Sequence, residues 1–132
     1  MTKGQKDLIR YKLSRAEETL EEARVMLQTD HAHGAANRIY YACFYVVTAL
    51  LLTRNLSSSK HRGVMALFNR HFIKPGLISK DMGKFYSRMF ENRLESDYAD
   101  WVEVEKQDIQ EELAHAEEFI IAVKALINNS IK

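Results

Sequence analysis

Three pairs of adjacent polar residues in this sequence have side chains that could bind or cleave a phosphodiester. They are Lys60-His61, Asn92-Arg93 and Asp97-Tyr98. Arginine suits phosphate because its planar guanidinium donates two parallel charge-assisted hydrogen bonds. Tyr98 could stack on a base or donate its hydroxyl, and the carboxylate of Asp97 could orient Arg93. A structural alternative stays open, in which Arg93 and Asp97 form an ion pair at a helix end and Tyr98 packs beneath it.

Charge is distributed unevenly along the 132 residues, although the net charge is only +1. Residues 54–93 contain nine basic and two acidic side chains, giving +7, whereas residues 94–132 contain three basic and ten acidic ones, giving −7. A basic segment can attract phosphate even when the whole chain is nearly neutral. The alternative is that helices packed side by side neutralise each other's charge within the fold.

Residues for metal or cofactor chemistry are lacking. Glu112 and His115 form one Glu-x-x-His pair, but a di-iron bundle needs two such pairs and two further carboxylates. His31 and His33, near Asp30, fit the solvated start of a helix. The sequence contains no phosphate-binding glycine loop, dinucleotide fingerprint or nucleophile elbow, and its single cysteine excludes a cysteine zinc cluster. We therefore predict no metal and no cofactor.

The elements that must position the polar pairs are helices. Apolar residues recur at steps of 4, 3, 4, 3 and 4 from Ile9 to Leu27 and again from Ile109 to Ile127, which is the spacing of one face of an amphipathic helix. Between them, the segment from His33 to Thr53 is apolar on nearly every side. Such a helix must be surrounded by other helices or by a second subunit.

Two shorter helices are predicted in the middle of the chain. Ser57–Ser59 offers an N-cap for a helix over about Lys60–Phe72, which Pro75 ends because proline cannot continue a helix. A further helix spans about Ser79–Leu94, followed by a polar connection over Glu95–Val102. We therefore predict an all-α single domain over residues 1–132, an up-and-down bundle of four to five helices.

The composition indicates a cytoplasmic protein. The start of the chain shows no secretory signal. The longest nearly apolar run, Ile39–Leu52, falls short of the roughly 20 residues that cross a bilayer. The single cysteine suits a reducing compartment. We expect no membrane association.

Four motifs in order carry a resemblance to a known family. They are Ala36-x-x-x-Tyr40-Tyr41-Ala42-x-Phe44, Ser59-Lys60-His61-Arg62-Gly63, Asn69-x-x-Phe72 with Gly76, and Arg93-x-x-x-Asp97-Tyr98. Their order and spacing, over about Gln5 to Ile127, resemble the HEPN domain family. The similarity is to its small stand-alone prokaryotic branch, which is associated with toxin–antitoxin pairs.

The resemblance implies a helical bundle that pairs as a homodimer, with the polar motif in a cleft near the two-fold axis. It also implies that the ligand is RNA or nucleotide phosphate, and that the chain acts as a metal-independent ribonuclease toxin. A small nucleotidyltransferase would be the partner protein. The alternative is a non-catalytic module that docks this nucleotidyltransferase, in which Tyr98 could accept a nucleotidyl group.

The sequence departs from the family pattern at one point. RNA-cleaving members carry a histidine four to six residues after the arginine, whereas here Leu94 follows Arg93 and the next histidine is His115. Histidine matters because imidazole transfers protons near neutral pH. We therefore leave open whether the chain is an enzyme. The candidate catalytic residues are Arg93, Asp97, Tyr98 and His61. The candidate binding residues are Lys60, Arg62, Asn92 and Tyr41.

Overall fold

The computed structural model describes the backbone of residues 1–98 and 104–131, and the side chains of residues 1–93 and 104–131. It consists of the helices α1 (Lys3–Gln28), α2 (Ala32–Leu52), α3 (His61–Phe68), α4 (Lys80–Tyr98) and α5 (Lys106–Ser130), with a π-helical turn, η1 (Asn69–Ile73), directly after α3. The described residues contain no strand. The predicted all-α bundle is confirmed.

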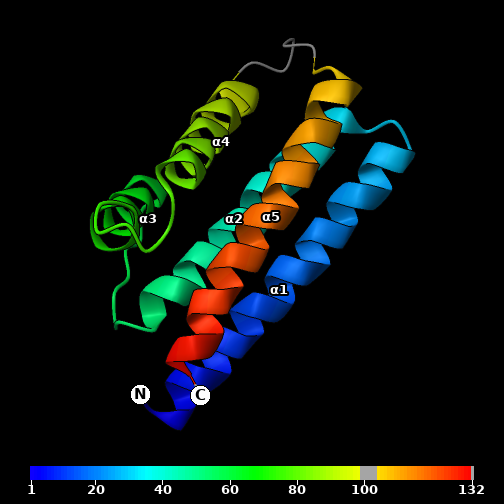
Figure 1. Cartoon of the computed structure of the whole chain (residues 1–132). Helices are drawn as coiled ribbons and strands as arrows, with labels where there is room; N and C mark the ends of the chain where they lie inside the picture. The colour runs from blue at the N-terminus through cyan, green and yellow to red at the C-terminus, as the bar shows by residue number, and fades with distance from the viewer. Residues whose placement is uncertain (99–103, 132) are drawn as a thin grey trace.

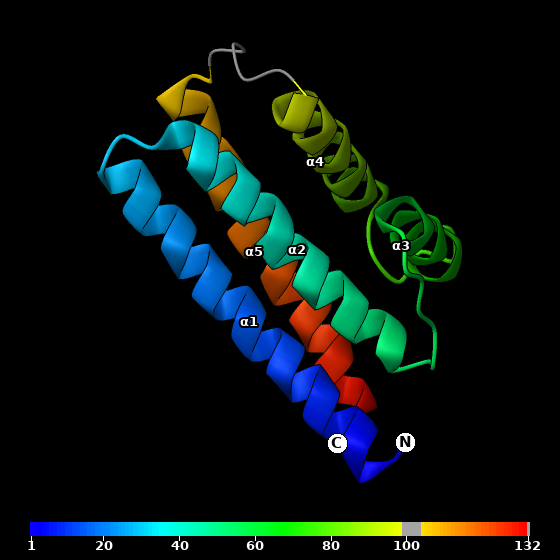
Figure 2. The same ribbon diagram turned by 180° about the vertical axis from the view of Figure 1, so that it is seen from behind.

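Helix α2 lies at the centre of the bundle. Helices α1 and α5 lie beside it and run along its length, as both views show (Figures 1 and 2). Helix α4 lies along another side of α2, and α3 crosses near the end of α2 where the chain leaves it (Figure 2). Segments of α2, α3 and α4 therefore meet at one place, although they are far apart in the sequence.

The apolar stripes form the core as predicted. In α1, Ile9 and Leu27 at the two ends of the stripe are buried, and in α5 the same holds for Ile109 and Ile127. Among the helices of the described residues, only α2 has the length and the apolar composition that crossing a membrane requires. Most of that apolar stretch is buried in the bundle, because other helices surround it.

The predicted helix over Lys60–Phe72 is present as two parts, α3 and η1. Asn55, just after α2, has a φ of 59°, in the left-handed region that asparagine tolerates better than most residues. The backbone N–H of Lys60 then donates to Ser58 Oγ at 3.2 Å, and α3 begins at the next residue. The chain leaves η1 through Pro75 and Gly76, and the φ of Gly76 is 86°.

Helix α4 ends later than the sequence indicated. Residues 95–98 continue the helix to Tyr98, so the predicted polar connection over Glu95–Val102 is wrong in its first half. No glycine or proline interrupts this segment, and the helix therefore continues. Arg93 lies within α4 rather than at its end. Asp97 and Tyr98 lie in its last turn, and their side chains are outside the described residues.

Candidate functional site

Tyr40 on α2 lies at the point where α2, α3 and α4 meet. Its side chain is buried, with 1% of its surface exposed. The Tyr40 hydroxyl and His61 Nδ1 form a hydrogen bond of 2.8 Å. On the Tyr40 ring, the Arg93 Cζ atom lies 5.1 Å from the ring centroid. One buried tyrosine thus contacts a histidine from α3 and an arginine from α4.

Aromatic rings fix the orientation of the His61 imidazole. The Phe44 ring stacks on it with centroids 4.1 Å apart and planes 9° from parallel, and Tyr41 meets it edge-on at 5.8 Å. The Tyr40 oxygen can accept from Nδ1–H both when the imidazole is neutral, with Nε2 unprotonated, and when it is protonated. The hydrogen bond to Tyr40 is therefore compatible with both protonation states of His61.

Arg93 is half-buried over a second aromatic ring. Besides lying over the ring of Tyr40, the Arg93 Cζ atom lies 5.9 Å from the centroid of the Phe90 ring. The Arg62 Cζ atom lies 5.2 Å from the same Phe90 ring. Because a guanidinium is attracted to the face of an aromatic ring, Phe90 brings positive charge from α3 and α4 together.

Burial keeps the phenols of this region neutral. Loss of solvation raises the pKa of Tyr40 to about 12, although the nearby Arg93 acts in the opposite direction. Tyr86 stacks on Tyr40 with centroids 6.2 Å apart, and burial also raises its pKa well above the ordinary value. At neutral pH both hydroxyls keep their protons, so Tyr40 can act as a neutral hydrogen-bonding partner for His61.

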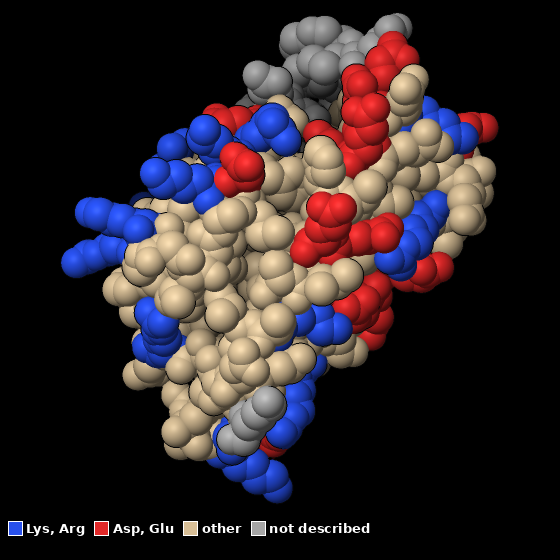
Figure 3. Space-filling model, in the orientation of Figure 1, with Lys and Arg blue, Asp and Glu red and all other residues tan. Residues whose placement is uncertain are grey.

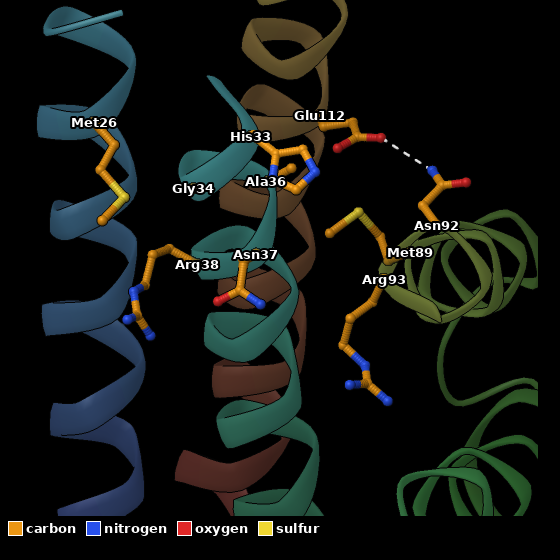
Figure 4. A pocket seen from close by; sticks show the side chains of 10 residues that line it. All are labelled: Met26, His33, Gly34, Ala36, Asn37, Arg38, Met89, Asn92, Arg93 and Glu112. Carbon is orange, nitrogen blue, oxygen red and sulfur yellow. Dashed lines mark hydrogen bonds between the residues drawn. The ribbon is translucent and has the colours of Figure 1, made fainter. Parts of the chain in front are cut away.

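A pocket of about 320 Å³ lies beside this cluster, and Arg93 belongs to both. Figure 4 shows the side chains that line it between α2 and α4. The Asn92 Nδ2 donates to Glu112 Oε1 at 3.3 Å. Glu112 is half-buried, and this burial raises its pKa. The other lining residues are Met26, His33, Gly34, Ala36, Asn37, Arg38 and Met89.

The structure brings some of the predicted site residues together and separates others. His61, Arg93 and Tyr41 all contact Tyr40. Lys60 is exposed at the start of α3, Arg62 is exposed against Phe90, and Asn92 is exposed at the rim of the pocket. The predictions for Asp97 and Tyr98 fall on side chains outside the described residues.

Sequence reasoning missed two functional candidates, Tyr40 and Glu112. A signal for Tyr40 existed, because a buried tyrosine needs a partner for its hydroxyl and α2 was expected to be buried on every side. Tyr41, its neighbour, was selected instead, and it is only half-buried. Glu112 was considered only as a metal ligand with His115, because its place at the pocket depends on how α4 packs against α5.

Basic side chains gather over α3 and α4, whereas acidic ones gather over α5 and α1 (Figure 3). The exposed basic residues of this part of the chain, called here the basic face, are Lys60, Arg62, Arg70, Lys74, Lys80, Lys84 and Arg88. The predicted charge split along the sequence is therefore also a split in space. Of these residues, Lys60 and Arg62 are the neighbours of His61 in the sequence.

Comparison with known proteins gives consistent matches. The sequence pattern of the HEPN domain matches residues 9–126. A "UPF0332 protein" of Thermotoga maritima is 48% identical over 122 residues, which is 92% of each chain. A protein of Methanocaldococcus jannaschii named "Putative toxin" is 31% identical over 98 residues, 74% of this chain and 67% of its own. A "UPF0332 protein" of Archaeoglobus fulgidus is 30% identical over 124 residues, 94% of this chain and 98% of its own.

Proposed function

The chain belongs to the HEPN domain family, and from this premise we propose that it is a metal-independent ribonuclease that acts as the toxin of a toxin–antitoxin pair. The observation that carries the proposal is the contact of both His61 and Arg93 with Tyr40. An imidazole and a guanidinium on one buried ring supply proton transfer and charge stabilisation. Those are the two requirements for cutting RNA without a metal.

The reaction begins with attack of the ribose 2′-hydroxyl on the adjacent phosphorus. Nε2 of His61 removes the 2′-hydroxyl proton as the new bond from the 2′-oxygen to phosphorus forms, while Nδ1–H donates to the Tyr40 oxygen. Arg93 donates hydrogen bonds to the non-bridging oxygens, where negative charge accumulates. The bond from phosphorus to the 5′-oxygen then breaks, and the imidazolium of His61 returns a proton to that oxygen. The products are a 2′,3′-cyclic phosphate and a 5′-hydroxyl.

The basic face supports RNA as the substrate. A polyanion gains affinity for each phosphate that it places near a lysine or arginine, and this attraction weakens as salt rises. Lys60 and Arg62 flank His61 in the sequence and are exposed. A strand held by these two side chains would therefore pass beside His61.

Two alanine variants test the proposal. We expect His61→Ala and Arg93→Ala each to reduce the rate of RNA cleavage in the presence of a chelator by on the order of 100-fold, the usual size of such contributions. His115→Ala and Arg10→Ala, which remove the same groups from exposed positions on α5 and α1, should cut RNA at the rate of the unsubstituted chain. Full activity of His61→Ala would refute the assignment.

The toxin role also implies partners. We propose a homodimer, supported by exposed large apolar side chains such as Tyr11 and Val25 on α1. The antitoxin would be a small nucleotidyltransferase. The alternative function, a non-catalytic docking module, is favoured if the purified chain retains this nucleotidyltransferase in a pull-down but does not cut RNA. A monomer in sedimentation at micromolar concentration would refute the homodimer.

A further inference from the structure

The pocket between α2 and α4 has no role in the cleavage chemistry, yet it adjoins the catalytic pair. Its volume of about 320 Å³ is at the small end of the range for ligand sites. Arg93 lines the pocket and also lies over the ring of Tyr40. In Figure 4 the Arg93 guanidinium points toward one end of the pocket, and Glu112 lies at the other. A group attached to the phosphate at Arg93 could therefore extend toward Glu112.

The lining suits a flat group with one polar edge. Met89 is buried, with 3% of its surface exposed, and with Ala36 it gives the pocket an apolar wall. Asn37, Asn92 and Glu112 add two amides and one carboxylate from three different helices. Proteins read single-stranded RNA by packing apolar or aromatic groups on a base and hydrogen bonding its edge. The pocket therefore has the composition of a nucleobase site.

The carboxylate of Glu112 determines which base fits. Asn92 Nδ2 donates to Glu112 Oε1 at 3.3 Å and holds the carboxylate in place. Each carboxylate oxygen has two acceptor positions, so both oxygens can accept further bonds. Guanine carries two adjacent donors, N1–H and N2–H, on its Watson–Crick edge and can donate to both oxygens in parallel. Adenine, cytosine and uracil do not present two adjacent ring-edge donors in this way.

We propose that this pocket binds the guanine base of the nucleotide whose phosphate lies at Arg93, with Glu112 accepting two hydrogen bonds from the base. The chain would then cut RNA next to guanine. The placement of the phosphate at Arg93 rests on the proposed function. Its specificity rests on Glu112, which takes no part in the cleavage step.

Titration with the 5′-monophosphates of guanosine, adenosine, cytidine and uridine tests the pocket directly. By calorimetry at low salt, guanosine monophosphate should bind about tenfold more tightly than the other three, the effect of one bidentate pair. Glu112→Gln exchanges an acceptor oxygen for a donor amide of the same shape and should bring this ratio to about one. Glu111→Gln removes the same charge from an exposed neighbour on α5 and should keep the preference.

Arg93→Ala separates recognition of the phosphate from recognition of the base. It should weaken binding of all four monophosphates and leave the preference for guanosine intact. The pocket assignment is overturned if the chain binds none of the four, if it binds all equally, or if Glu112→Gln keeps the preference. Binding does not require cleavage. A chain that prefers guanosine monophosphate but cuts no RNA would refute the ribonuclease and not the pocket, and cleavage without this preference would refute the pocket alone.

Discussion

At the residue level, Tyr40 makes two contacts, one with its ring and one with its hydroxyl. Its ring supports the Arg93 guanidinium, and its hydroxyl bonds the His61 imidazole. Burial raises the pKa of Tyr40 to about 12, so the phenol stays protonated when the imidazole gains or loses a proton. The phenol oxygen can accept from Nδ1–H of both the neutral and the protonated imidazole, so the hydrogen bond would persist while Nε2 gains and loses a proton in the proposed reaction.

Tyr40→Phe tests the hydroxyl separately from the ring. The ring of phenylalanine should still lie under Arg93, whereas the hydrogen bond to His61 is lost. We expect kcat for RNA cleavage to fall about tenfold, in line with a hydrogen bond of about 1.4 kcal/mol, with little change in KM.

The control for this variant is Tyr45→Phe, on the same helix and half-buried, which should leave kcat unchanged. A variant at Tyr40 with the kcat of the unsubstituted chain would show that the hydroxyl does not position His61. A rise in KM with constant kcat would mean that Tyr40 serves substrate binding instead.

At the level of elements, the start of α3 sets the position of His61. Gly63 lies in the first turn of α3, directly against Ser58 in the preceding loop. A Cβ atom on Gly63 would collide with Ser58 Oγ, and it would lie 2.9 Å from Ser58 Cβ. The absence of a side chain at this position therefore lets the loop pack closely on the helix that carries His61.

Gly63→Ala should lower the melting temperature, although alanine favours a helix over glycine by about 1 kcal/mol. The same variant should also reduce RNA cleavage, because the shifted loop displaces His61. Thermal unfolding by circular dichroism and the cleavage assay measure the two effects. Gly4→Ala, where the added Cβ meets only Thr2 Oγ1 at 3.9 Å, should be neutral or stabilising.

A second substitution distinguishes the collision from a general intolerance of alanine. Ser58→Gly removes the side-chain atoms that the added Cβ would meet, so the double variant Gly63→Ala with Ser58→Gly should recover most of the lost stability and activity. If it recovers neither, the close packing of this loop does not position α3.

The sequence predicted the elements better than their contacts. The stripes of α1 and α5 are confirmed because burial on one helix face leaves a periodic record in the local sequence. The predicted end of α4 was too early, because no residue of the segment after Leu94 marks a helix end. The choice of Tyr41 over Tyr40 reflects the same limit. Neighbouring residues of a helix point in different directions, and only the packing of α3 against α2 decides which tyrosine hydroxyl bonds to His61.

For the whole molecule, charge is arranged so that the basic face is separate from the acidic side. Among the described residues, three ion pairs connect α5 to α1 or to the turn after it: Lys124–Glu17 at 2.8 Å, Lys106–Asp30 at 3.0 Å and Arg24–Glu117 at 3.6 Å. The expectation that neighbouring helices neutralise each other's charge therefore holds in part for α1 and α5. The basic face over α3 and α4 remains a concentrated positive surface (Figure 3).

Stability of the whole molecule should fall at alkaline pH. Burial raises the pKa values of Tyr40, Tyr86 and Cys43. The unfolded chain therefore loses these protons at lower pH than the folded one, and ionisation favours unfolding. For Tyr40 the loss begins near pH 10 and continues to about 12, at up to about 1.4 kcal/mol per pH unit.

Urea unfolding between about pH 8 and pH 12 measures this effect, and Tyr40→Phe should give a shallower decline above about pH 10. The comparison is between slopes, so a change in overall stability of the variant does not affect it. An identical slope in the two proteins would show that the Tyr40 phenol is not protected in the folded state.

The central claim is that His61 and Arg93 cut RNA through its own 2′-hydroxyl. The most direct measurement is the end chemistry of the products when the unsubstituted chain acts on RNA in excess chelator, beside the same oligonucleotide with 2′-deoxyribose throughout. We predict 2′,3′-cyclic phosphate and 5′-hydroxyl ends from RNA and no cleavage of the deoxy substrate. Cleavage of both substrates, or cleavage of RNA only after a divalent metal is added, would contradict the account.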